Sequence, residues 1–161
     1  MPGDASGSPT AWSPGGKIKV VPWHPSIVHF PIALAAAAAV FQLIAVGTGK
    51  SHFTVSALIA LVIGAIMALA AAVTGTAQGE AAQRVPGIEA TLERHELLGT
   101  LSTAIMLALG ITAFYLHMKK VLPSRLFLAA LIALAILLLV TGYMGGQLVY
   151  LHGAGRPLTG D

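Results

Sequence analysis

Four long apolar segments constrain this chain more than any other feature of its sequence. They cover residues 27–46, 53–73, 97–116 and 126–148. Each is roughly 20 residues long, which is the length an α-helix needs to cross about 30 Å of hydrocarbon. Hydrophobic residues make up 56% of the chain and charged residues only 9%, more apolar surface than a soluble domain of this size can bury. We therefore predict an all-α integral membrane protein, a four-helix bundle with up-down topology.

The connections between these segments define two sides of the membrane. Residues 47–52 and 117–125 form short loops, whereas residues 74–96 form a longer polar connection. With four crossings, both chain ends and the long connection share one side, here called side A, and the short loops share the other, side B. We expect a short interfacial segment in the long connection, with residues 89–96 leading into the third helix. The predicted domains are a flexible tail at 1–26, the transmembrane domain at 27–152 and a C-terminal tail at 153–161.

The basic residues favour one orientation of this topology. Side B carries Lys50, Lys119, Lys120 and Arg125 with no acidic residue, whereas side A carries all six acids and five basic residues. Lysine and arginine accumulate in short cytoplasmic loops, so we predict that side B is cytoplasmic. The protein is then a multi-pass protein of the bacterial inner (cytoplasmic) membrane with both termini extracytoplasmic. The nine basic residues form no long run, which argues against a nucleic-acid partner.

Four of the six histidines fall on side A, at the ends of different predicted helices. Ligands from separate elements are what a metal ion or a haem requires. The chain has no cysteine, which excludes thiolate-held clusters and covalently attached haem, so a cofactor depends on histidine or oxygen ligands. We assign no function to the histidines of side B, His52 and His117. The side A histidines are His24, His29, His95 and His152.

A haem b site near side A is the leading hypothesis for these residues. His29 and His95 begin the first and third helices, which lie diagonally in an up-down bundle, and we predict that they are the axial ligands. His152 replaces one of them if the packing differs. We expect His24, which precedes Pro25, to lie outside the helix and to act as an outer or interfacial group.

The helix faces below these histidines consist of small residues. Gly99 lies one turn after His95, and Gly145 lies on the face below His152. One interpretation is that these positions leave a slot for a flat macrocycle, which makes both glycines candidate cofactor-binding residues. The alternative is the close packing of small residues that membrane helices commonly use without any cofactor.

A lone transition metal is a second possible occupant of side A. His29, His95 and His152, with Glu96 or Glu80, offer a nitrogen and oxygen ligand set for zinc, copper or iron. No catalytic residue is predicted in either case. A chlorin pigment held by a single histidine is a third possibility.

Three sequence segments resemble an uncharacterised bacterial family of four-helix membrane domains. They are HPSIVHFPIAL at residues 24–34, ERHELLG at 93–99 and GGQLVYLHG at 145–153. The resemblance implies an electron-transfer setting, because members of that family are sometimes fused to Rieske iron–sulfur or cytochrome c domains.

Together these observations predict a membrane-embedded electron-transfer protein or subunit that binds haem b through two histidines near the extracytoplasmic face. Its expected partners are the lipid bilayer and a redox protein or a larger membrane complex. It resembles an electron-transfer subunit more than a self-contained enzyme. The alternatives are a structural or pigment-binding subunit of a respiratory or photosynthetic complex, or a histidine-based metal site.

Overall fold

The chain is described by a computed structural model over residues 23–121 and 124–154. Every regular element in this part is an α-helix. The elements are α1 (Trp23–Ile27), α2 (His29–Thr48), α3 (Ser51–Ala82), α4 (Glu89–Met118) and α5 (Arg125–Tyr150).

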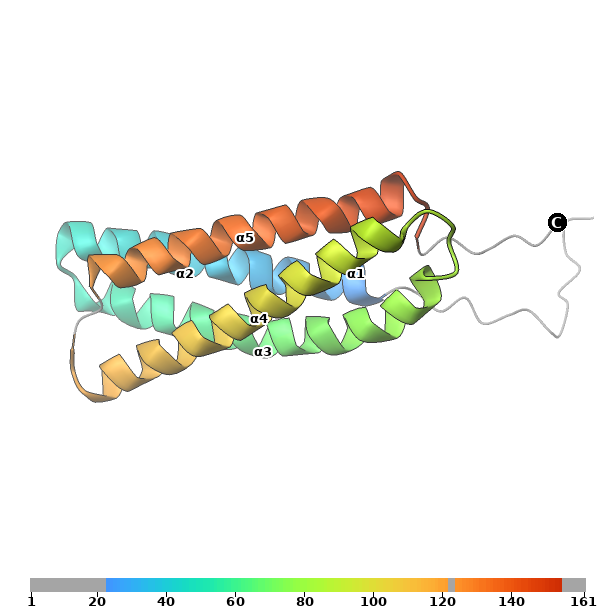
Figure 1. Cartoon of the computed structure of the whole chain (residues 1–161). Helices are drawn as coiled ribbons and strands as arrows, with labels where there is room; N and C mark the ends of the chain where they lie inside the picture. Colours follow the sequence, from blue (N-terminus) through green and yellow to red (C-terminus); the bar gives the residue numbers. More distant parts are fainter. Residues whose placement is uncertain (1–22, 122–123, 155–161) are drawn as a thin grey trace, which may run out of the picture.

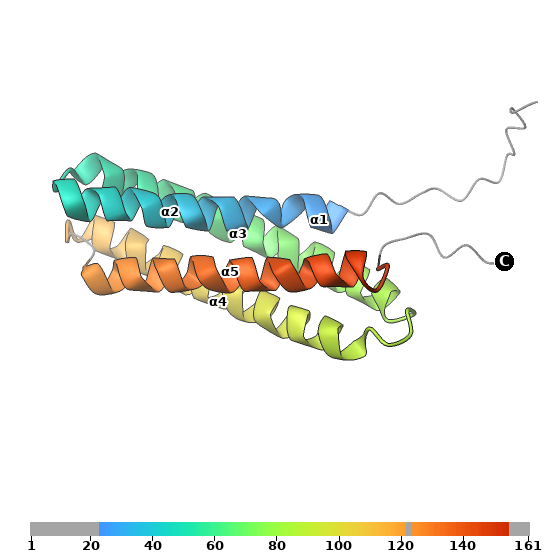
Figure 2. The same ribbon diagram turned by 90° about the horizontal axis from the view of Figure 1, so that it is seen from above.

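The four long helices run up and down beside one another as a bundle (Figures 1 and 2). Around the bundle α2 packs against α3, α3 against α4, α4 against α5, and α5 against α2, so that α2 lies diagonally opposite α4. The short helix α1 lies at one end of α2 and packs against α3. Helix α1 and the α3–α4 loop lie at one end of the bundle, side A, and the other two loops lie at side B (Figure 1). The predicted up-down four-helix fold is confirmed.

All four helical segments are long and apolar enough to cross a membrane. They span Trp23–Thr48, Ser51–Glu80, Glu89–Met118 and Arg125–Tyr150. Large apolar side chains such as Ile66, Ile111 and Leu139 point out of the bundle, where lipid covers them. The interior is built largely from small residues around a few larger side chains, including Leu61, Met106 and Leu131, which lets the helices approach closely.

The connection on side A is shorter than the sequence predicts. Helix α3 continues to Ala82 and α4 begins at Glu89, so residues 83–88 alone form the loop and a separate interfacial segment is absent from it. The apolar run marks the hydrocarbon layer rather than the end of the helix, and residues 74–82 include several alanines, which favour helix. The expected lead-in from Glu89 into the third long helix is confirmed.

A proline interrupts the helix at its entry on side A. Pro31 has no N–H to donate to the carbonyl of Ile27, and its ring crowds that carbonyl. The helix breaks at Val28, between α1 and α2. The expectation that His24 lies outside the helix is wrong, because α1 begins at Trp23. Pro25 then occupies the first turn, where a helix tolerates the missing N–H.

Candidate functional site: a histidine pair at side A

Two histidines from different elements meet inside side A. The rings of His24 on α1 and His95 on α4 have centroids 6.3 Å apart and planes at 83°, an edge-on arrangement. Both side chains are half-buried. The sequence predicts an outer or interfacial role for His24, whereas the structure makes it the partner of His95.

The ring of His95 is oriented by the backbone of α5. Its Nδ1 lies 3.0 Å from the carbonyl oxygen of Thr141. A carbonyl oxygen only accepts hydrogen bonds, so Nδ1 carries the hydrogen and donates it. A neutral ring in this tautomer has a free lone pair on Nε2.

The ring of His24 is oriented by a side chain of α3. Its Nδ1 lies 3.2 Å from the hydroxyl oxygen of Thr74. That hydroxyl donates its own hydrogen to the carbonyl of Ala70, at 2.9 Å, so it accepts from His24 Nδ1. His24 therefore adopts the same tautomer as His95, and each ring presents Nε2 as an electron-pair donor.

Each imidazole rests on a glycine of a neighbouring helix. A Cβ atom built on Gly75 of α3 would lie 2.9 Å from Cε1 of His24, and one on Gly145 of α5 would lie 3.1 Å from Cε1 of His95. A side chain at Gly75 would therefore force the ring of His24 to shift, and one at Gly145 would push the ring of His95 by a few tenths of an ångström. Gly145 therefore lies under His95 rather than under His152, and its space is filled by a ring of the chain itself.

Gly99 has a packing contact of a different kind. A Cβ there would lie 4.0 Å from Cγ2 of Thr141, an ordinary van der Waals distance between α4 and α5. Small residues at this level thus serve close helix packing, as the alternative interpretation expects. A role of Gly99 and Gly145 toward a cofactor stays a prediction.

The other two candidate histidines lie outside this pair. His29 is exposed, and its Nδ1 is hydrogen-bonded to the carbonyl of Pro25 in the preceding turn. His152 is half-buried in the bend after α5, where its backbone N–H donates to the carbonyl of Gln147 at 3.3 Å.

The described residues of side A do not form a three-ligand metal centre. Within the described part of the chain, no three histidine, aspartate or glutamate side chains lie close enough together to share a metal ion. The side chains of His29, His95 and His152 are therefore not brought together around one point in the structure. The physical reason is that the ring of His29 turns back toward α1, and the exposed carboxylate of Glu96 lies against Gly79 of α3.

The sequence interpretation missed the groups that orient the pair. Thr74 and Thr141 supply the hydrogen-bond acceptors, and Gly75 supplies the space for His24. Each threonine is followed directly by a glycine near the predicted side A boundary, at Thr74-Gly75 and Thr141-Gly142. A threonine beside a glycine at that level is the pattern by which they could have been found.

Comparison with known proteins places the chain in a family. Residues 20–157 match the family described as "Predicted membrane protein (DUF2231)", and the chain belongs to it. This confirms membership of an uncharacterised membrane family. No curated protein and no solved structure matches the chain.

Proposed function

We propose that this member of the DUF2231 family binds haem b between His24 and His95 and transfers electrons at side A of the membrane. The observation that carries the proposal is the edge-on pair of imidazoles, in which Nδ1 of each ring is hydrogen-bonded to a neighbouring helix and the tautomer leaves the lone pair on Nε2. His24 takes the place that the sequence interpretation gave to His29.

The donor set fits a haem iron. Metal–imidazole nitrogen bonds are about 2 Å long, so two imidazoles on opposite sides of one metal have nitrogens about 4 Å apart and ring centroids about 6 Å apart. The two rings lie 6.3 Å apart. Metal-binding histidines also usually donate their other N–H to a carbonyl or a similar acceptor, which fixes the tautomer. Thr141 and Thr74 are such acceptors.

The residues of the chain determine what such a site can do. Two imidazoles on one haem leave no open position on the iron, a ligation suited to electron transfer rather than to oxygen chemistry. The backbone carbonyl of Thr141 holds one ring on α5 and the Thr74 hydroxyl holds the other on α3. The basic loops of side B favour an extracytoplasmic side A in a bacterial inner membrane, so the redox partner would approach from that face.

A structural role in a larger membrane complex is the second candidate. Aromatic rings pack edge to face with centroids about 4.5–7 Å apart, and the observed 6.3 Å and 83° also satisfy this geometry. In that case the pair joins α1 to α4, and the hydrogen bonds to α3 and α5 complete a packing unit.

An absorption spectrum of the purified protein, reduced minus oxidised, separates the two candidates. We expect a Soret band and a sharp reduced α band, lost in His24→Ala and in His95→Ala but kept in His29→Ala. His95→Gly with added imidazole guards against a folding defect, and the band should return. A wild-type protein without haem absorption after expression with haem supplied, or a band that survives both alanine variants, overturns the proposal. A band far to the red would instead identify a chlorin.

A further inference from the structure

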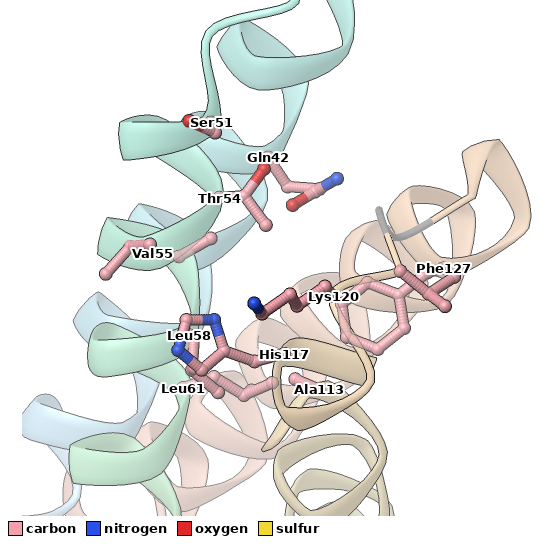
Figure 3. Close-up of a pocket in the computed structure, with 12 residues that line it drawn as sticks. Gln42, Ser51, Thr54, Val55, Leu58, Leu61, Ala113, His117, Lys120 and Phe127 are labelled. Carbon is pink, nitrogen blue, oxygen red and sulfur yellow. The ribbon is translucent and has the colours of Figure 1, made fainter. Parts of the chain in front are cut away.

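A cavity of about 320 Å³ lies at side B, at the opposite end of the bundle from the histidine pair. It is lined by Gln42 from α2, Thr54 and Leu61 from α3, His117 at the end of α4, and Lys120 in the turn that follows (Figure 3). Its wall therefore combines an amide, a hydroxyl, an imidazole and an ammonium group with apolar side chains.

The amide oxygen of Gln42 lacks a hydrogen-bond partner among the residues that the structure describes. Gln42 is only 2% exposed, and its Oε1 is buried without a hydrogen bond. Buried polar atoms almost always have a partner, and an exception points to a missing water, ion or ligand. A carbonyl oxygen accepts hydrogen bonds, so the missing group is a donor.

Lys120 occupies a backbone position that favours glycine. It is the non-glycine residue of the described chain with a positive φ, at 55°. Its N–H donates to the carbonyl of His117 and the N–H of Val121 to that of Leu116, each at 3.0 Å, a helix ending in which glycine is the usual residue at this position. Helix α2 ends at the same side with Gly49 at φ 69°.

The side chain of Lys120 explains why a strained residue is present there. Figure 3 shows its ammonium group between His117 and the side of the cavity that carries Thr54 and Gln42. Unusual backbone conformations concentrate at functional sites, and the inference runs from the observed outlier to a function. From this turn, Lys120 extends its ammonium group into the cavity.

The positive charge at this end has no acidic partner within the described chain. Lys50, Lys119 and Arg125 surround the same end as Lys120. The acidic residues of the described part are Glu80, Glu89, Glu93 and Glu96, which all lie toward side A. An anion that neutralises the cavity must therefore come from outside this part of the protein.

We propose that the side B cavity binds the head group of an anionic phospholipid that carries free hydroxyl groups, as phosphatidylglycerol does. The phosphate lies by Lys120 and His117, and a head-group hydroxyl donates to Oε1 of Gln42. The cavity lies where the long helices end, at the level of lipid head groups, and basic pockets between transmembrane helices are suited to such lipids. The acyl chains then run along apolar side chains that face the lipid beside the cavity, such as Ile59 and Phe114.

Native mass spectrometry of the full chain tests the proposal. The protein is released from vesicles that contain equal amounts of phosphatidylglycerol and phosphatidylcholine with the same acyl chains. We expect the wild type to retain phosphatidylglycerol preferentially. Lys120→Gln should lower this preference about five-fold, because the phosphate loses a hydrogen bond from a charged donor. Lys119→Gln is the matched control, because Lys119 lies 5.7 Å from the ring of Tyr115 and is not among the residues that line the cavity. It should leave the preference nearly unchanged.

Two further variants separate binding from folding. Lys120→Gly should raise the melting temperature, because glycine suits the positive φ, and still lose the preference for the anionic lipid. Gln42→Leu should abolish discrimination between phosphatidylglycerol and phosphatidic acid, which lacks the head-group hydroxyls. Equal losses in Lys119→Gln and Lys120→Gln, or retention of a neutral lipid or quinone instead, overturn the proposal. So does displacement of the lipid by soluble glycerol phosphate, which would identify a water-soluble ligand.

Discussion

The two ends of the bundle differ in whether their buried polar side chains have hydrogen-bond partners within the described chain. At side A both histidines of the pair have Nδ1 bonded to a group of a neighbouring helix, at 3.2 Å for His24 and 3.0 Å for His95. At side B the buried amide of Gln42 has an oxygen without a partner. The histidine rings of side A are therefore oriented by groups of the chain itself, whereas Gln42 at side B has no hydrogen-bond donor within the described part of the chain.

Glycines sharpen the same contrast. At side A, Gly75 and Gly145 make room for imidazole rings, and their backbone conformation is ordinary. At side B, Gly49 ends α2 with a positive φ, but Lys120 carries a side chain at the equivalent place after α4. Space is required at one end, and a charged side chain is kept at the other despite its strain.

The largest effect is expected from filling the space under the histidines. Gly75→Ala places a methyl group 2.9 Å from the ring of His24, and overpacking of this kind lowers the free energy of unfolding by about 1–3 kcal/mol. Gly146→Ala is the control, because nothing lies within 4 Å of a Cβ there. It should stabilise α5 by up to about 1 kcal/mol. Thermal unfolding in detergent measures both, and equal melting temperatures would show that the ring of His24 moves aside freely.

The next effect concerns the unpaired amide at side B. Gln42→Met keeps a similar shape and removes the buried acceptor, whose lack of a partner costs about 1–3 kcal/mol. We expect a higher melting temperature in detergent without anionic lipid and a smaller gain in phosphatidylglycerol vesicles. Ser102→Ala is the counterpart, because Ser102 is buried but already bonded to the carbonyl of Leu98 at 2.6 Å. It should bring no gain, and a destabilised Gln42→Met in detergent would contradict the contrast between the two ends.

The fold was predictable because the length of an apolar run is a direct measure of a membrane crossing. All four segments were identified, including the start of the third long helix at Glu89. The end of α3 at Ala82 was not predicted, because hydropathy marks where lipid ends, and the helix continues beyond that point through polar residues and alanines. The hydropathy pattern shows how much of each helix lies in the lipid, and it does not show how far the helix extends.

The sites were less predictable, because their partners depend on how each helix rotates about its axis. Helices that are apolar on every side carry no periodic pattern that fixes this rotation. His24 and His29 are five residues apart, and the break before Pro31 determines which of them reaches His95. The cavity at side B was missed although Gln42 is an amide in the middle of an apolar run, and polar residues inside a membrane usually have a role.

The smallest effect separates the two ways in which the histidine rings are held. Thr74→Val removes the hydroxyl that accepts from His24 Nδ1, whereas Thr141→Val leaves the backbone carbonyl that accepts from His95. We expect Thr74→Val to lower the free energy of unfolding by about 1 kcal/mol, the value of one hydrogen bond, and to release His24 into a mixture of tautomers. Nitrogen-15 chemical shifts of the two rings report this directly. His95 should keep the hydrogen on Nδ1 in both variants, and a His24 signal unchanged by Thr74→Val would show that another group orients that ring.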